Sequence, residues 1–353
     1  MNGDPPSFLH ALLLLCRRFV RYLGMRCVIA VFGSVLIVIV WAAALTQIDL
    51  DRRVTEENAI TQNSNLVKAF EEHTVRTLKG IDAALLFIMH EYARLGTQID
   101  IATYIRDGYI DGGLFANIGI SDPRGDMLAS SQPRTRPINI SDREYFRVHI
   151  ERDSKRLFFS KPLQSRITGT WTFPMSRRIT RADGSFGGVV SVAVDPRYFS
   201  DFYQKAELGT HGVVDLIGAG GISRSRRDGA TASVGFDHQG ANLLRMRELN
   251  PVGNLLTRGI ADGNRRYVSY RKLADYPLTI IVGTSEDEVL APHLQRKRQY
   301  LWAAVLVSLI VVLMSALLAL AVRRQQAAAA ELARINAELE SRVASRTMRE
   351  VSL

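Results

Sequence analysis

Two long uncharged runs dominate the hydrophobic pattern of this 353-residue chain. The first extends from Cys27 to Leu45 and the second from Tyr300 to Val322. Each reaches about the 20 residues that a helix needs to cross roughly 30 Å of hydrocarbon. Trp41 and Trp302 lie near the ends of these runs, where aromatic rings favour the headgroup level. The pattern predicts transmembrane helices at 27–45 and 300–322.

Four arginines, at positions 17, 18, 21 and 26, precede the first run. A cleaved signal peptide also begins with basic residues, but its apolar core is about 7 to 15 residues long and lies closer to the N-terminus. An uncleaved anchor is therefore the favoured interpretation. Lys and Arg mark the cytoplasmic side of a membrane protein. We therefore expect a protein of the inner membrane in which residues 1–26 form a basic cytoplasmic N-terminus and residues 46–299 lie outside the cytoplasm.

Residues Thr46 to Tyr92 contain almost no Gly or Pro, and their apolar positions follow one helical face. These positions are Leu66, Phe70, Thr74, Leu78, Ile81, Leu85, Ile88 and Tyr92. The spacing predicts one long helix that is continuous with the first span and packs the exported domain.

After Gly108 the pattern changes to short β-rich runs separated by turn residues. Strands are expected at Leu114–Ser121, Met127–Ser130, Leu157–Ser160, Trp171–Ile179 and Gly187–Val194. Between them Ser141 is expected to cap a short helix over 142–150, with Glu144 completing a capping box. These elements predict a mixed module with an antiparallel sheet at about 93–204.

A second, smaller module is expected at about 205–284. Asp195 is expected to cap a linking helix over 196–204. Strands then follow at Gly212–Ile217, Gly221–Arg224, Arg266–Arg271 and Leu278–Gly283. The intervening Ser225–Asn264 is rich in Gly, Arg and Asn, and is expected to be mostly loop with a short helix near Leu243. Ser285 precedes a helix that leads into the second span.

Beyond the second span, residues 323–353 carry apolar side chains at Leu332, Ile335 and Leu339, with Val343 or Arg342 next. This spacing predicts a coiled coil and therefore a parallel homodimer. The segment resembles the signalling helix that leads to output domains in sensor kinases and diguanylate cyclases. Because the sequence contains neither a phosphoacceptor histidine motif nor a Gly-Gly-Asp-Glu-Phe run, we expect either a kinase or cyclase partner or a truncated receptor.

The formal net charge of +10 does not indicate nucleic-acid binding, because many of the arginines flank the apolar runs. Anionic membrane lipids are a sufficient partner for them. Both cysteines, Cys16 and Cys27, lie outside the predicted exported domain, which must therefore be stable without disulfides.

Several short stretches together resemble the double Cache sensor domains of bacterial transmembrane receptors. They are Asp142-Arg143-Glu144-Tyr145-Phe146, Phe159-Ser160-Lys161-Pro162, Thr168-Gly169-Thr170-Trp171, Ser176-Arg177-Arg178, Asp183 through Val190, and Val194-Asp195. The resemblance covers about Thr46 to Tyr300. It implies an α+β fold with a long N-terminal helix and two PAS-like antiparallel-sheet modules.

In amino-acid-sensing members of that family, an Arg and aromatics on the short helix bind the ligand carboxylate, and a later Asp binds the ammonium. The matching positions are Arg143, Tyr145, Phe146 and Asp195. Ser141 and Tyr145 replace the usual Tyr and Trp, and Phe146 has no hydroxyl. The resemblance therefore leaves the ligand open between an amino acid and another small carboxylate.

The residues themselves point to the same chemistry. A small anion favours a preorganised guanidinium, for which Arg143 and Arg178 are the candidates. Trp171, Tyr145 and Phe159 would form the apolar walls.

Enzymatic motifs are missing from the sequence. It contains no HExxH and no GxSxG motif, and Gly218–Gly221 lacks a P-loop lysine. We therefore expect a non-catalytic receptor without a cofactor, which senses a small ligand outside the cytoplasm. The alternative is an envelope protein-binding or assembly module with the same fold.

Overall fold

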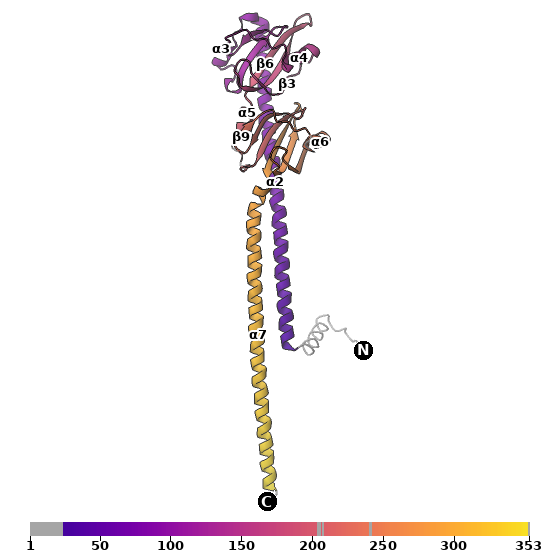
Figure 1. Cartoon of the computed structure of the whole chain (residues 1–353), viewed down its shortest axis with the longest axis vertical. Coiled ribbons are helices and arrows are strands. Elements are labelled where there is room, and N and C mark those ends of the chain that lie inside the picture. The colour runs from indigo at the N-terminus through magenta and orange to yellow at the C-terminus, as the bar shows by residue number, and fades with distance from the viewer. Residues whose placement is uncertain (1–23, 203–205, 207, 240–241, 352–353) are drawn as a thin grey trace, which may run out of the picture. The chain divides into compact units, whose positions relative to one another are not determined.

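The computed structural model describes residues 24–202, 206, 208–239 and 242–351. The chain divides into two compact units, one made of residues 1–53 and 292–353 and the other of residues 54–291. The larger unit contains both β-sheets, whereas the smaller unit contains two long helices (Figure 1). The predicted α+β architecture, with a long helix at each end, is confirmed.

Helix α2 (Met25–Leu95) is the long N-terminal element that the apolar spacing predicts. Within the larger unit its buried positions follow steps of three and four residues, at Val67, Phe70, Thr74, Leu78, Ile81, Leu85 and Ile88. Leu66 and Tyr92 lie half-buried beside this stripe. The stripe joins residues of both sheets in one hydrophobic core, so α2 supports both modules.

The first module, which we expect to be membrane-distal and call the distal module, contains a six-stranded antiparallel sheet in the order β2-β1-β6-β5-β3, with β4 also paired to β5. Its strands are β1 (Phe115–Ser121), β2 (Met127–Ser130), β3 (Phe158–Phe159), β4 (Leu163–Gln164), β5 (Trp171–Thr180) and β6 (Phe186–Val194). Its helical elements are η1 (Gly96–Gln98), α3 (Ile101–Arg106), η2 (Gly112–Leu114) and α4 (Glu144–Glu151). The expected strands are confirmed within a few residues, apart from the two-residue β4.

The predicted capping box at α4 is wrong, because the helix begins at Glu144 and its N-cap residue is Arg143 without a side-chain cap. Asn139 explains the later start, since its Oδ1 accepts hydrogen bonds from the N–H (2.9 Å) and the hydroxyl (2.6 Å) of Ser141. The carboxylate of Glu144 instead accepts hydrogen bonds from Ser160 and Lys161. Ser141 therefore stays in the turn before the helix.

The second module, which we expect to be membrane-proximal, has another antiparallel sheet in the order β10-β11-β12-β7-β8-β9. Its strands are β7 (Val213–Gly218), β8 (Ser223–Asp228), β9 (Thr231–Ser233), β10 (Val252–Arg258), β11 (Arg265–Lys272) and β12 (Leu278–Ser285). Helix α5 (Arg197–Phe202) precedes the sheet, and α6 (Asn242–Leu249) lies near the predicted short helix. The expected loop over Ser225–Asn264 is wrong in part, because β8 continues to Asp228 and both β9 and β10 lie within it. Part of the predicted linking helix, at 203–204, falls outside the described residues.

In the smaller unit, α2 and α7 (Glu286–Val351) contact each other along their apolar segments. Trp41 Nε1 donates to Ser308 Oγ over 3.2 Å. A Cβ added at Gly33 would lie 2.7 Å from Ser315 Oγ, so the glycine permits close packing of the helices. Both helices contain windows of high mean hydropathy, 2.8 and 3.0, and they are long and apolar enough to cross a membrane. Two candidate membrane helices thus flank the two-sheet unit in sequence.

Candidate functional site

A small cavity lies beside α4 in the distal module, with a volume of about 30 Å³. Arg143 and Tyr145 come from the start of α4, and Asn117 and Ser191 from the sheet. Gly125 directs the chain into α4, because its carbonyl accepts from Ile140 N over 2.8 Å. Its φ of +87° and its contact with Ser141 exclude a larger side chain there.

Arg143 lines this cavity, and most N–H donors of its guanidinium have no hydrogen-bond partner among the described residues. Its one hydrogen bond is a long one, 3.4 Å to Gln164 O, and among the described residues no carboxylate lies within ion-pair distance. The neighbouring Arg166 differs, because both of its terminal nitrogens lie 2.7 Å from the Asp142 carboxylate. That hydrogen-bonded pair lowers the pKa of Asp142 and raises the pKa of Arg166. Arg143 therefore presents the unneutralised positive charge.

Tyr145 and Asn117 add neutral donors to the same cavity. Burial raises the pKa of Tyr145 to about 12, so its hydroxyl remains protonated. Asn117 is buried, and its Oδ1 accepts from Ser130 Oγ, Ser131 Oγ and Gln132 N. These donors fix the amide orientation and leave Nδ2 without a partner in the described part of the chain. Asn117 is a polar residue within the apolar strand β1, and this pattern could have identified it from the sequence. It is not among the predicted site residues.

Two other predicted site residues, Phe146 and Phe159, belong to the packing around the cavity or to the main core. Phe146 is fully buried and meets the Phe186 ring edge-on at 5.6 Å. Phe159 packs against Phe173 and Tyr276, with ring centroids 6.3 and 5.6 Å away. Neither ring lines the small cavity. Their ligand contacts stay a prediction.

Arg178 has partners of its own. It forms an ion pair of 3.2 Å with Asp153, donates to the carbonyl of His149, and lies 4.8 Å above the Phe186 ring. Its side chain is only 9% exposed. These contacts commit its charge to holding α4 against the sheet, while its ligand role stays a prediction.

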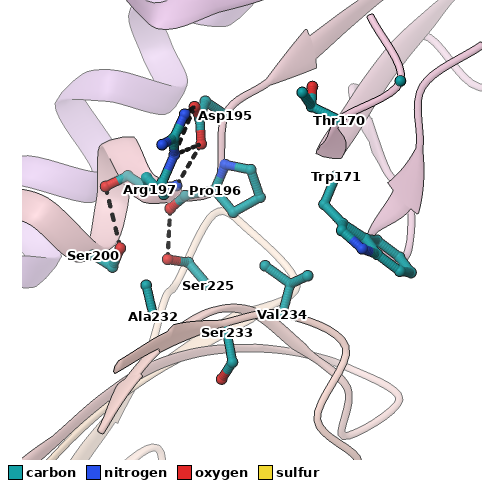
Figure 2. A pocket seen from close by; sticks show the side chains of 11 residues that line it. Thr170, Trp171, Asp195, Pro196, Arg197, Ser200, Ser225, Ala232, Ser233 and Val234 are labelled. Carbon is teal, nitrogen blue, oxygen red and sulfur yellow. Dashed lines mark hydrogen bonds and ion pairs between the residues drawn. The ribbon is translucent and has the colours of Figure 1, made fainter. Parts of the chain in front are cut away.

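The remaining two predicted residues, Trp171 and Asp195, line a wider cleft of about 600 Å³ between the two sheets (Figure 2). Figure 2 shows Asp195 and Arg197 on one side and Trp171 on the other, with Val234 below. The Asp195 carboxylate accepts from Arg197 N over 2.8 Å and forms an ion pair of 2.7 Å with its guanidinium. Although burial alone would raise the pKa of Asp195, these hydrogen bonds lower it overall. The Asp195 side chain therefore caps the N–H of Arg197 at the start of α5, in agreement with its predicted capping role, and it lines a different cavity from Arg143.

The distal cavity can thus offer one guanidinium, one phenol and one amide N–H₂ to a ligand. This set of donors suits an anion, because every polar group named can donate to a carboxylate oxygen. Within the described ranges, no cluster of three or more His, Cys, Asp or Glu side chains could hold a metal ion.

Comparisons with known proteins place the larger unit in a family. The Cache domain profile matches residues 52–293. No curated protein sequence matches the chain. The extracellular domain of the candidate histidine kinase rpHK1S-Z16 is 29% identical, with a TM-score of 0.58 over 65% of this chain and 95% of that one.

Two chemoreceptor domains are more distant. The ligand-binding domain of Campylobacter jejuni Tlp3, solved with L-valine, is 15% identical with a TM-score of 0.45 over 68% of this chain and 98% of that one. That of Pseudomonas fluorescens CtaA, solved with L-isoleucine, is 13% identical with the same TM-score and the same coverage. The assignment therefore rests on the family profile and the histidine kinase domain. Because the profile covers more than half of the chain and both sheets, the chain belongs to the Cache domain family of extracellular sensor domains.

Proposed function

We propose that this chain is a two-span receptor of the inner membrane, which binds a small carboxylate, amino acids included, in its membrane-distal module. The sensor domain would lie outside the cytoplasm, and α7 would carry the signal to a cytoplasmic coiled coil. A kinase or cyclase partner would then receive the signal from this coiled coil. The chain itself is proposed to be non-catalytic and to work as a homodimer.

The observation that carries the ligand proposal is the uncompensated charge of Arg143. Arg143 is the N-cap residue of α4, so the helix fixes the position of its backbone. Its guanidinium makes one hydrogen bond of 3.4 Å and has no carboxylate partner among the described residues. An arginine held in this way is preorganised to bind an anion. Tyr145 and Asn117 add donors from the other walls. Asp195 lies in another cavity, so carboxylate binding is better supported than simultaneous recognition of an ammonium group.

The cavity of about 30 Å³ holds about one water molecule, so a carboxylate ligand requires the cavity to open. The segment 163–167 lines it and is held by the Arg166–Asp142 pair. This pair is half-exposed and its net contribution to stability is small. Outward movement of that segment is therefore the proposed opening step.

A thermal-shift experiment on the full chain in lipid nanodiscs tests the site. Small carboxylates and amino acids would be screened at high concentration, because a ligand bound only by the folded state adds about 2.7 kcal/mol at a hundredfold excess over its Kd. We expect at least one to raise Tm, and Arg143→Ala to abolish that shift.

Arg147→Ala is the matched control, because Arg147 is an exposed arginine on the same helix that does not line the cavity. It should keep the full shift. A ligand response that survives Arg143→Ala would place the site elsewhere. No response to any compound would favour the protein-binding or assembly alternative.

A further inference from the structure

A cleft of about 670 Å³ lies where the distal module meets the second module. Helix α2, the segment before β3 and strand β5 line one side of it, and the turn between β11 and β12 lines the other side. In its wall, the ring of Phe159 meets the ring of Tyr276 edge-on, with centroids 5.6 Å apart. A ligand in this cleft would therefore contact both modules.

The charged residues that line the cleft are Asp82, Lys155, Arg156, Arg177, Lys272 and Asp275. Four positive and two negative side chains give the cleft a net charge of +2. Arg177 and Asp82 neutralise each other, because Arg177 Nε and Nη2 lie 2.5 and 2.7 Å from the two carboxylate oxygens. The third nitrogen of Arg177 donates to the Lys155 carbonyl, so this guanidinium has no terminal nitrogen left for a ligand. The excess charge belongs to the other cations.

Lys155, Arg156 and Lys272 are these other cations, and all three are exposed. Among the described residues, no carboxylate lies within ion-pair distance of any of them. Asp275 is the one remaining acid of the lining, and it is also exposed and outside any described ion pair. Side chains of like charge repel one another when they share a cleft, so an anion that neutralises them is favoured there.

The hydroxyl of Tyr276 adds a neutral donor to this lining. Burial raises the pKa of Tyr276, so the phenol stays protonated. Its hydroxyl has no hydrogen-bond partner in the part of the chain that the structure describes. The cleft therefore offers one phenol, one guanidinium and two ammonium groups, and each of them donates hydrogen bonds.

We propose that this cleft binds a compact phosphate-containing anion with at least two negative charges. Lys155 and Arg156 would hold it from the distal module, and Lys272 from the second module. Lysine ammonium groups act as point charges toward phosphate, and each hydrogen bond that they donate is charge-assisted. The site is separate from the distal carboxylate site and does not depend on it.

Isothermal titration calorimetry tests this site on the full chain in nanodiscs of zwitterionic lipid, at fixed ionic strength and without divalent metal ions. The probes are inorganic pyrophosphate and methanesulfonate, which carries a single negative charge. We expect pyrophosphate to bind at least about tenfold more tightly than methanesulfonate, because it can engage cations of both modules. Arg156→Gln and Lys272→Gln should each weaken pyrophosphate binding by about tenfold, because each removes a charge-assisted hydrogen bond.

Asp275→Asn separates a binding site from a folding defect. It removes the unpaired acid of the lining and should strengthen pyrophosphate binding, which a damaged fold would not do. Arg152→Gln is the matched control, since it removes one positive charge from an exposed position of the same segment outside the lining. This variant should keep the affinity of the wild type within about twofold.

Three outcomes would overturn the proposal. Pyrophosphate would fail to bind the wild type, or Arg152→Gln would weaken its binding as much as Lys272→Gln does, which would indicate general attraction to a basic surface. In the third outcome, Arg143→Ala would abolish pyrophosphate binding and so assign it to the distal cavity. The expected result for Arg143→Ala is unchanged pyrophosphate binding, whether or not that variant loses its response to carboxylates.

Discussion

At the scale of single residues, His149 on α4 is a buried histidine whose proton can be placed. It is 1% exposed, and its Nε2 lies 2.9 Å from Ser176 Oγ. The only hydroxyl proton of Ser176 is donated to the Tyr145 carbonyl over 2.7 Å. Nε2 must therefore carry the proton and donate to Ser176. This hydrogen bond ties the helix that carries Arg143 to strand β5.

From the lowered pKa of His149 we predict that the free energy of unfolding decreases in mild acid. Burial lowers its pKa from 6.5 to about 4, helped by Arg178, while the contact with Ser176 opposes the shift. Between these values the unfolded chain binds a proton that the folded chain does not, so stability is lost as pH falls from 6.5 to 4, by up to about 3 kcal/mol. His149→Gln keeps an N–H donor without titrating. The Tm difference between pH 7 and pH 4.5, measured in nanodiscs, should be smaller in the variant, and equal differences would contradict this account.

The sequence alone could not show which arginine is free to bind a ligand and which is already paired within the protein. Arg143 and Arg178 are equal candidates in the sequence, but Arg178 meets Asp153 and the Phe186 ring, whereas Arg143 meets only Gln164 O. The partners come from segments that are distant in sequence, so local pattern does not contain them. Asn117 was visible as a polar residue in an apolar strand, but its significance depended on which face of β1 borders the cavity.

At the scale of elements, the secondary structure was predicted correctly where a single hydrophobic periodicity extends over many residues. It was predicted wrongly at edge strands whose side chains are largely exposed. The stripe of α2 from Phe70 to Ile88 repeats over several turns, and its burial follows the spacing. Strand β10 alternates between exposed and half-buried residues, and β9 is exposed throughout. Such strands are stabilised by pairing with β11 and β8. That stabilisation comes from backbone hydrogen bonds, which composition does not reveal.

The C-terminal part of α7 carries an apolar stripe that is exposed in the single chain. Leu332, Ile335 and Leu339 are 63%, 46% and 54% exposed. Their spacing of three and four residues predicts that this stripe packs against the same stripe of a second subunit.

Cross-linking tests this helix pairing. Single cysteines at Leu332, Ile335 and Leu339, in a background without Cys16 and Cys27, should form disulfides between subunits faster than a cysteine at Arg334, which lies outside the stripe. The assay measures dimer formation on non-reducing gels after mild oxidation. Equal rates at all four positions would contradict a defined coiled-coil face.

At the scale of the whole molecule, the contacts within the smaller unit constrain how the chain crosses a membrane. Asp51 follows the first apolar segment, and His293 and Arg296 precede the second. The Asp51 carboxylate lies 2.7 Å from His293 Nδ1 and 2.8 Å from Arg296 Nε, and the hydrogen bond from His293 is the main reason that the pKa of Asp51 is lowered. If both apolar segments cross a bilayer, this contact requires the two segment ends to lie on the same side of it.

Because Lys and Arg favour the cytoplasmic side, we expect the arginines before Cys27 to stay in the cytoplasm, which would place Asp51 and His293 outside it. Alkaline phosphatase, which is active only outside the cytoplasm, should be active when fused after Gly209 and silent when fused at Leu353. Green fluorescent protein is not fluorescent when it is exported unfolded, so the same two fusions should give the reverse pattern: no fluorescence after Gly209 and fluorescence at Leu353. Because Arg296, Lys297 and Arg298 precede the second apolar segment, the competing expectation is that this segment fails to insert. Phosphatase activity at Leu353 would support that outcome and would contradict the two-span topology on which signal transfer through α7 depends.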